Sequence, residues 1–526
     1  MGRRAGHRLR AGLLAALLAG LSGCALNSPV PTPPTASPPT LPSPPADPGT
    51  PGRCGAVPLH ADRELRGMWL ATVTNLDFPS RGGLTRDEVL AEFRGWLDLA
   101  ERFHHNAIFV QVRPTGDAFW PSAYAPWSQW LTGRLDGADP GWDPLAEFIA
   151  ETHARGLEFH AWFNPFRGAQ RAEVGGPGTD WDKLAPGHPL LAHRDWAVIY
   201  PRGDEQQSAF YFDPGVPEAR RFVQDAILEA VANYDLDAVH FDDFFYPYPV
   251  DGEEFDDSAS FARYGEGSRA AWRRANIDAF VRAMGERIKQ LKPWVKYGIS
   301  PFGIWKNRIS DGGAGTRGLE AYHAIHADTR KWVREGWVDY IVPQLYWQLG
   351  FERADYAALL PWWVKQVDGT DVQLYIGQAD YRVGTGGAWD KPAELSRQLA
   401  LAREHRVAGF VHFRASSLRA DTLGAQTRYR ERFYAAPALV PVMAQLPAAP
   451  PPAPQGVTAT PLGDRVELRW EASPGAAHYA VYRIEGEAAD LVGQVAGTSF
   501  TGEPGVHCVS ALDRSWNEGP ASSPAG

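Results

Sequence analysis

The sequence predicts an α/β chain in which a (β/α)8 barrel is followed by a small all-β sandwich. Two observations predict the barrel: eight short apolar runs alternate with longer stretches of 3.6-residue periodicity, and polar residues two positions apart close most of the runs. A third observation predicts the sandwich, because the chain shows only short alternating segments after a second proline-rich break. An open, doubly wound sheet is the alternative that the same alternation leaves.

Length, charge and composition set the first limits. The 526 residues carry a net charge of −10, and 44% of them are hydrophobic, which is enough for a large core and two or three domains. The chain also holds 20 Trp, 18 Tyr and 24 Phe, whose rings can stack on sugars or on bases. The acidic balance argues against nucleic acid as the partner.

Residues 1–23 have the composition of a lipoprotein signal peptide. Four arginines precede an apolar segment, 11–21, that is too short to span a bilayer. The segment runs into Leu21-Ser22-Gly23-Cys24, which resembles the lipobox of bacterial lipoproteins, whose cysteine carries the lipid. Removal of residues 1–23 takes away four arginines and no acids, so the mature charge is −10 − 4 = −14. We expect lipidation of Cys24; the alternative is an ordinary signal peptide with an incidental cysteine.

Residues 24–58 are predicted to form a proline-rich tether. Eleven prolines lie within residues 28–52, among serine, threonine and alanine. Such a composition cannot build a core and favours an extended, semi-rigid segment. The two other cysteines, Cys54 and Cys508, exclude a cysteine-based metal site, and the sequence leaves open whether they pair in an oxidising envelope.

The barrel is predicted to occupy residues 59–440. Its eight apolar runs are residues 66–73, 106–113, 157–165, 238–246, 295–302, 340–347, 373–381 and 409–418. Helical periodicity fills the intervals, as at 87–103 and 272–291. The active site of such a barrel lies at the carboxyl ends of its strands, so the residues that close each run are the candidates.

Polar side chains two residues apart close six of the runs. Each pair points to one face of its strand, and six pairs that converge on one rim predict a polar pocket for a hydroxyl-rich ligand. The predicted sugar-binding residues on the strands are Arg113, His160, Trp162, Asn164, His240, Gln344, Tyr346, Asp380 and Arg414. The residues that follow the strands add Asp77, Tyr246, Trp305 and Trp347.

The fourth run carries the predicted chemistry. Asp242 shares a face with His240, whereas Asp243 starts on the opposite face unless the chain has begun to turn. Glycoside hydrolysis uses two carboxyl groups: an acid with a raised pKa, and a nucleophile or base. We predict Asp242 as the acid, oriented by His240, and Asp243 or Asp117 as its partner. The further candidates for the partner are Asp77 and Asp380.

Residues 441–455 are predicted to be a proline-rich linker, and residues 456–526 a sandwich. Strands are expected at 457–460, 465–470, 477–483 and 505–512. With Trp470, Tyr479 and Tyr482, this pattern resembles a fibronectin type III domain, although His507 stands where such a domain has a tyrosine.

Five motifs in order along the chain resemble those of one family of envelope proteins. They are ELRGMWLATV at 64–73, HAWFNP at 160–165, FDDFFY at 241–246, ADTRKW at 327–332 and PQLYW at 343–347. The resemblance is to the glycosyl-hydrolase-like 10 family and covers roughly residues 64–435. It implies a barrel glycosidase, and it carries the paired acids of the family onto Asp242 and Asp243. In one member of the family, the acid after the second strand falls on Thr115 rather than Asp117, and the position of Asp380 is apolar.

The expected function is an envelope-anchored glycoside hydrolase that cleaves glycan strands by a two-carboxylate mechanism. The resemblance implies peptidoglycan without stem peptides as the substrate, with cell-wall or divisome proteins as further partners. No phosphate loop and no zinc-ligand spacing occur, so no cofactor and no metal are predicted. Two alternatives remain: a non-catalytic glycan-binding lipoprotein, and a metal-dependent deacetylase that uses His160, His240 and Asp242.

Overall fold

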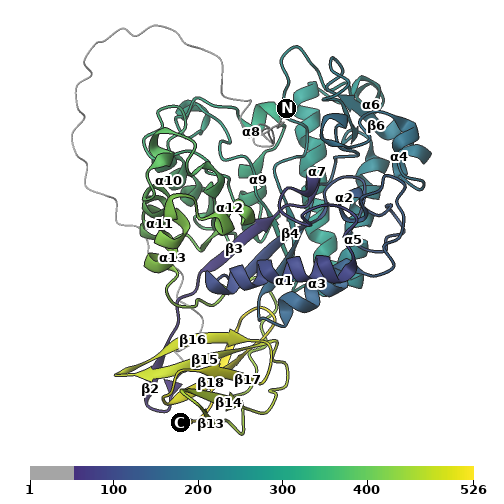
Figure 1. The fold of residues 1–526 in the computed structure, drawn as a ribbon. Helices are drawn as coiled ribbons and strands as arrows, with labels where there is room; N and C mark the ends of the chain where they lie inside the picture. The colour runs from purple at the N-terminus through teal and green to yellow at the C-terminus, as the bar shows by residue number, and fades with distance from the viewer. Residues whose placement is uncertain (1–52) are drawn as a thin grey trace, which may run out of the picture. The chain divides into compact units, whose positions relative to one another are not determined.

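The computed structural model describes residues 53–526, which are drawn in colour in Figure 1. They contain a closed barrel of eight parallel strands. The strands are β3 (Leu65–Leu70), β4 (Ala107–Arg113), β5 (Glu158–Phe163), β8 (Ala238–Phe241), β9 (Lys296–Ile299), β10 (Tyr340–Ile341), β11 (Gln373–Gln378) and β12 (Gly409–His412). Since β12 pairs with β3, the sheet has no free edge. All eight predicted runs contain a strand, so the predicted barrel is confirmed and the open-sheet alternative is wrong.

Helices connect the strands and surround the barrel (Figure 1). In chain order they are α1 (Arg86–Arg102), α2 (Gln129–Thr132), α3 (Pro144–His153), α4 (Pro189–Ala192), α5 (Pro217–Asn233), α6 (Ser258–Tyr264), α7 (Arg269–Leu291), α8 (Ala321–Ala324), α9 (Thr329–Arg334), α10 (Tyr356–Val367), α11 (Glu394–Glu404), α12 (Ala415–Ala420) and α13 (Ala425–Phe433). A capping box between Thr85 and Glu88 starts α1, and the helix buries Val89, Phe93 and Trp96.

The barrel interior is a packed core and not a channel. Trp69, Phe109, His160, His240 and Tyr340 fill it, and none is more than 2% exposed. The rings of Phe109 and His160 lie 4.2 Å apart, and those of Phe109 and His240 lie 4.9 Å apart. Because the interior is filled, a ligand can reach the barrel at its rim, where the strands end.

The C-terminal residues form a sandwich of two sheets, within which the C-terminal strands pair antiparallel. One sheet has the order β13-β14-β17 and the other contains β16-β15-β18-β19. The strands are β13 (Thr458–Leu462), β14 (Arg465–Arg469), β15 (His478–Glu485), β16 (Ala488–Val495), β17 (Ser499–Gly502), β18 (His507–Leu512) and β19 (Glu518–Ala521). The strands pack around Leu468, Trp470, Tyr479 and Val509. This arrangement confirms the predicted fibronectin type III-like fold.

The first described residues belong to the same sandwich. The strand β2 (Val57–His60) pairs in parallel with β16, and β1 (Arg53–Cys54) pairs with β2. A disulfide joins Cys54 to Cys508 of β18, with a Cα–Cα distance of 5.7 Å. The end of the predicted tether, 53–58, and the first two residues assigned to the barrel thus extend a sandwich sheet. The predicted signal peptide, Cys24 and the rest of the tether lie outside the described residues.

Replacing Cys54 with serine is expected to lower the free energy of unfolding by about 2–4 kcal/mol. The disulfide joins residues 454 positions apart, so its loss frees a long loop in the unfolded chain. Thermal unfolding of the oxidised full-length chain measures the effect. Cys508→Ser should give the same midpoint, as should the unmodified chain under reducing conditions. An unchanged midpoint in either variant would contradict the expectation.

The helices of residues 53–526 include none with the length and apolar character that a membrane crossing requires.

Candidate functional site

Two buried carboxyl groups stand together where β8 ends. Asp242 and Asp243 follow directly after the strand and are 6% and 4% exposed. The backbone turns at this point, since the N–H of Phe244 donates to Asp242 Oδ1 at 3.1 Å. Gln344, which follows β10, donates to Asp243 Oδ1 at 3.1 Å. The turn therefore directs both acids to the rim, although a straight strand would point them to opposite faces.

A chain of hydrogen bonds across three neighbouring strands fixes Asp242. Asn164, just beyond β5, donates from Nδ2 to Asp242 Oδ2 at 2.6 Å. Gln111 of β4 donates to Asn164 Oδ1, also at 2.6 Å. The backbone N–H groups of Thr72 and Val73, which follow β3, donate to Gln111 Oε1 at 3.0 and 2.9 Å. Both amide groups are thus oriented, and Asn164 can present only its N–H to the acid.

Asp243 has different surroundings that favour its neutral form. Its Oδ1 accepts the bond from Gln344, and its Oδ2 accepts one from the hydroxyl of Tyr248. Burial, together with the charge of Asp242, raises the pKa of Asp243 to about 7. Burial also raises the pKa of Asp242, but the Arg167 guanidinium and the bond from Asn164 oppose this. Asp243 is therefore the better acid, whereas the sequence predicted Asp242 for that role.

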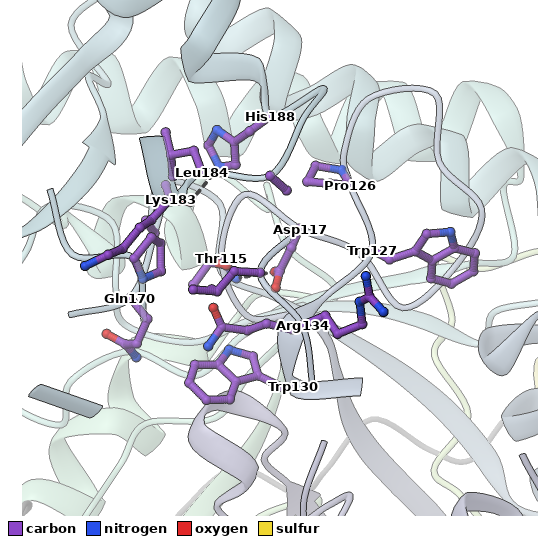
Figure 2. A pocket seen from close by; sticks show the side chains of 16 residues that line it. Thr115, Asp117, Pro126, Trp127, Trp130, Arg134, Gln170, Lys183, Leu184 and His188 are labelled. Atoms are coloured by element: carbon purple, nitrogen blue, oxygen red, sulfur yellow. Dashed lines mark hydrogen bonds between the residues drawn. The ribbon is translucent and has the colours of Figure 1, made fainter. Parts of the chain in front are cut away.

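Asp117, the other acid predicted to be catalytic, lines a separate cavity of about 40 Å³. Figure 2 shows its side chain there with those of Thr115, Trp130, Arg134 and His188. The N–H of Thr115 donates to Asp117 Oδ1 at 3.1 Å, and burial raises the pKa of Asp117. Neither acid of the pair at the end of β8 lines this cavity, so the structure gives Asp117 a site of its own.

Asp77 and Asp380 are engaged in fixed contacts within the protein. Asp77 Oδ2 accepts from the N–H of Ala71 at 3.1 Å, and its Oδ1 lies 3.6 Å from Arg414 Nε. Asp380 Oδ2 lies 2.8 Å from His412 Nδ1. Both carboxyl groups are fully buried. The sequence predicted that Asp77, Asp380 and Arg414 contact sugar. In the structure their side chains instead bond to other parts of the protein and stabilise the rim.

The two predicted site histidines lie inside the barrel. His240 Nε2 accepts from the indole of Trp69 at 3.1 Å, and its Nδ1 lies 3.2 Å from the Tyr340 hydroxyl. His160 contacts the same hydroxyl at 2.9 Å and Glu158 at 2.9 Å. Burial lowers the pKa of both imidazoles. The histidines therefore brace the barrel interior, and the orienting role predicted for His240 falls to Asn164. Within residues 53–526, no three His, Cys, Asp or Glu side chains form a metal-site cluster.

Three further predicted residues are packed into the protein. Arg113 is fully buried and donates to the carbonyl of Asn164 at 3.2 Å, and burial lowers its pKa to about 10. Tyr246 is 2% exposed. The indole of Trp305 donates to Asp328 at 2.8 Å. These side chains support the rim loops. Trp162 is 6% exposed, and its buried indole N–H has no hydrogen-bond partner among the described residues.

Partly exposed aromatic side chains from the segments that follow the strands form what we call the aromatic rim, and the hydroxyl of its member Tyr248 donates to Asp243. Its members are Phe244, Tyr248, Phe302, Tyr346, Trp347 and Phe413. Tyr346 stacks on Phe413 with ring centroids 5.9 Å apart. Trp347 meets Phe302 edge-on at 5.5 Å, and Phe302 lies 6.0 Å from Tyr248. Of these six residues, only Tyr346 and Trp347 were predicted as site residues. The other four lie in segments that follow barrel strands, and this position was the sequence feature that could have identified them.

Arg167 was also missing from the predicted site. Its guanidinium lies 4.5 Å from the ring centroid of Phe244, and its positive charge opposes the rise in the pKa of Asp242 and Asp243. Arg167 lies three residues after Asn164, in the segment that follows β5. This position beyond the carboxyl end of a barrel strand could have identified it as a candidate site residue.

Comparison with known proteins agrees with this geometry. The family described as "Glycosyl hydrolase-like 10" matches residues 64–393. "Glycosyl hydrolase YngK" of Bacillus subtilis (strain 168) is 43% identical over 441 residues, which cover 81% of this chain and 84% of that protein. "Glycosyl hydrolase DigH" of Escherichia coli (strain K12) is 37% identical over 392 residues, or 71% of this chain and 83% of the relative. Because the family model matches residues 64–393 and a relative is 43% identical over 81% of this chain, the chain belongs to the glycosyl hydrolase-like 10 family.

Proposed function

We propose that this chain is a glycoside hydrolase that cleaves peptidoglycan glycan strands from which the stem peptides have been removed. The observation that carries the proposal is the buried pair at the end of β8, in which Asp243 is biased toward its neutral form and Asp242 is held by donors. Two carboxyl groups with different surroundings are the requirement for acid-assisted glycoside cleavage. The relatives YngK and DigH are both named glycosyl hydrolases, which supports the same chemistry.

In this proposal Asp243 gives its proton to the oxygen of the departing sugar. Asp242 stays ionised and stabilises the positive charge that develops on the sugar left behind. Asn164 and Gln344 hold the two acids in place. The aromatic rim supplies flat faces for sugar rings, and a strand without stem peptides leaves those ring faces accessible.

We also propose that the enzyme works in the cell envelope, anchored by lipid on Cys24. The basic residues before segment 11–21 and the cysteine that follows it support this placement. Cell-wall or divisome proteins are the expected further partners. Recovery of the chain from cells entirely in the soluble fraction would contradict the anchor.

Incubation of the full-length chain with amidase-treated glycan strands tests the hydrolase. New reducing ends should appear with these strands and be far fewer with strands that keep their stem peptides. Binding without new reducing ends would favour a glycan-binding role. Release of acetate, lost on addition of a chelator, would favour a deacetylase.

The pH dependence of cleavage follows from the two acids. Asp243 must be protonated to act, so kcat/KM should fall about tenfold per pH unit above about 7. Asp242 must be ionised, so the rate should also fall on the acidic side. Initial rates measured from pH 4 to 9 give the profile. A rate that rises steadily up to pH 9 would rule out Asp243 as the acid.

A further inference from the structure

We propose that the nucleophile in this site is the 2-acetamido group of the substrate itself, and that Asp242 orients it. The inference rests on the proposed hydrolase function and specifies its substrate class: the sugar that is cut must carry an N-acetyl group at C2. Asp242 then binds the acetamido N–H, and the carbonyl oxygen of that group attacks the anomeric carbon.

The first argument is the position of the two acids in the chain. An enzyme that attacks with its own carboxylate places its two carboxyl groups on opposite sides of the glycosidic bond, about 5–5.5 Å apart. Asp242 and Asp243 are consecutive residues at one strand end, with Cα atoms about 3.8 Å apart. Asn164 holds one of them and Gln344 the other, both from strand ends of the same rim. Both acids therefore approach a bound sugar from the same side of the barrel.

The second argument concerns the other acids at the strand ends. Asp77 bonds to the backbone at Ala71 and lies beside Arg414, and Asp380 contacts His412. Asp117 lines its own cavity. Among the strand-end acids that the structure describes, none besides the pair is placed to attack from the opposite face. The substrate must then supply the attacking oxygen, or water must.

The third argument is that Asp242 suits an orienting role. Its two oxygens each accept one bond, from Phe244 N–H and from Asn164. Since a carboxylate has about four acceptor positions, it can still accept an amide N–H. Burial raises the pKa of Tyr346 well above its ordinary value, and nearby charges that include Asp243 and Asp242 add to the rise. Its hydroxyl therefore stays protonated and can donate to the acetamido carbonyl oxygen.

The proposed step balances in atoms and charge. The acetamido oxygen forms a bond to C1 as the bond from C1 to the leaving oxygen breaks, and the proton of Asp243 goes to that oxygen. The resulting oxazolinium ring is cationic, and ionised Asp242 stabilises it through the N–H. Water then attacks C1, gives one proton back to Asp243 and reopens the ring. The product keeps the anomeric configuration of the substrate.

Matched substrates test the inference with the full-length chain. Peptide-free glycan strands should be cut at least about 100-fold faster than the same strands after removal of their N-acetyl groups. A thiazoline that mimics the cyclised sugar should inhibit the chain. Asp242→Asn should lower kcat about 10²–10³-fold and weaken thiazoline binding at least about 100-fold. Glu205→Gln, which changes an exposed acid, should leave both properties as they are.

The outcomes separate this inference from the proposed function. Equal cleavage of acetylated and de-acetylated strands, an inverted product, or a covalent glycosyl adduct on Asp242 would overturn the inference and leave the hydrolase standing. Absence of cleavage with either substrate would overturn the hydrolase, and the inference with it.

Discussion

Replacing Asp243 with asparagine is expected to lower kcat for cleavage of peptide-free glycan strands about 10²–10⁴-fold. Asparagine keeps the shape of the side chain but has no proton of suitable acidity for the leaving oxygen. KM should change little, because the aromatic rim and Asp242 remain. Reducing ends counted over time at several strand concentrations separate kcat from KM. A variant with at least half the normal kcat would exclude Asp243 as the acid.

The same variant should be more stable than the unmodified chain at pH 8. The pKa of Asp243 is about 7 when folded, against 3.8 for an ordinary aspartate, because it is buried beside Asp242. Between these two values the folded chain binds more protons than the unfolded chain, so its stability falls as the pH rises through this window. Asparagine cannot ionise and avoids that loss. Thermal unfolding should show a higher midpoint for Asp243→Asn at pH 8 and no difference at pH 3.

An inactive Asp243→Asn that unfolds at a lower temperature than the unmodified chain at pH 8 would contradict this account. It would mean that the substitution damages the fold, so the loss of activity would say nothing about acid catalysis. If Asp243 is a catalytic acid that burial destabilises when it is ionised, Asp243→Asn should lose activity and gain stability at pH 8.

The barrel could be predicted because its signals are local. The period of the apolar residues separates strands from helices, and the turn at Phe244 lies within two residues of the acids that it directs. The sandwich edge could not be predicted in this way. The strand β2 pairs with β16, and Cys54 forms a disulfide with Cys508, 454 positions away. Both contacts join distant parts of the chain, so the local sequence pattern does not predict them.

The site was predicted only in part. The alternation of side chains along a strand shows which face a residue occupies, but it does not show whether the residue lies inside the barrel or at the rim. His160, Trp162 and Asn164 share one face of β5 and its extension. His160 lies in the filled interior with Tyr340, whereas Asn164 reaches Asp242 at the rim. Asp117 lies four residues beyond the end of β4, where alternation gives no direction at all.

The second large effect is expected below the rim, at Glu158 in the first position of β5. Glu158 is 1% exposed and pairs with the ammonium of Lys296, which is 2% exposed. It also lies 2.9 Å from His160 Nε2 and accepts the indole N–H of Trp516 at 2.6 Å. Glu158→Gln should lower the free energy of unfolding by about 3–5 kcal/mol, because it leaves a buried lysine without its counter-charge. Denaturant unfolding at pH 7 measures the loss.

The pH and a double substitution identify the charge as the cause. Although burial opposes ionisation, the charge of Lys296 and the bond from His160 bring the pKa of Glu158 below its ordinary value. The stabilisation is then present above pH 4.5 and is lost as the pH falls toward the lowered value, so the variant and the unmodified chain should converge in acid. Lys296→Met added to Glu158→Leu removes both charges and should recover most of the stability. If the double variant is as unstable as Glu158→Gln, the shape of the side chains and not the buried charge holds this part of the barrel together.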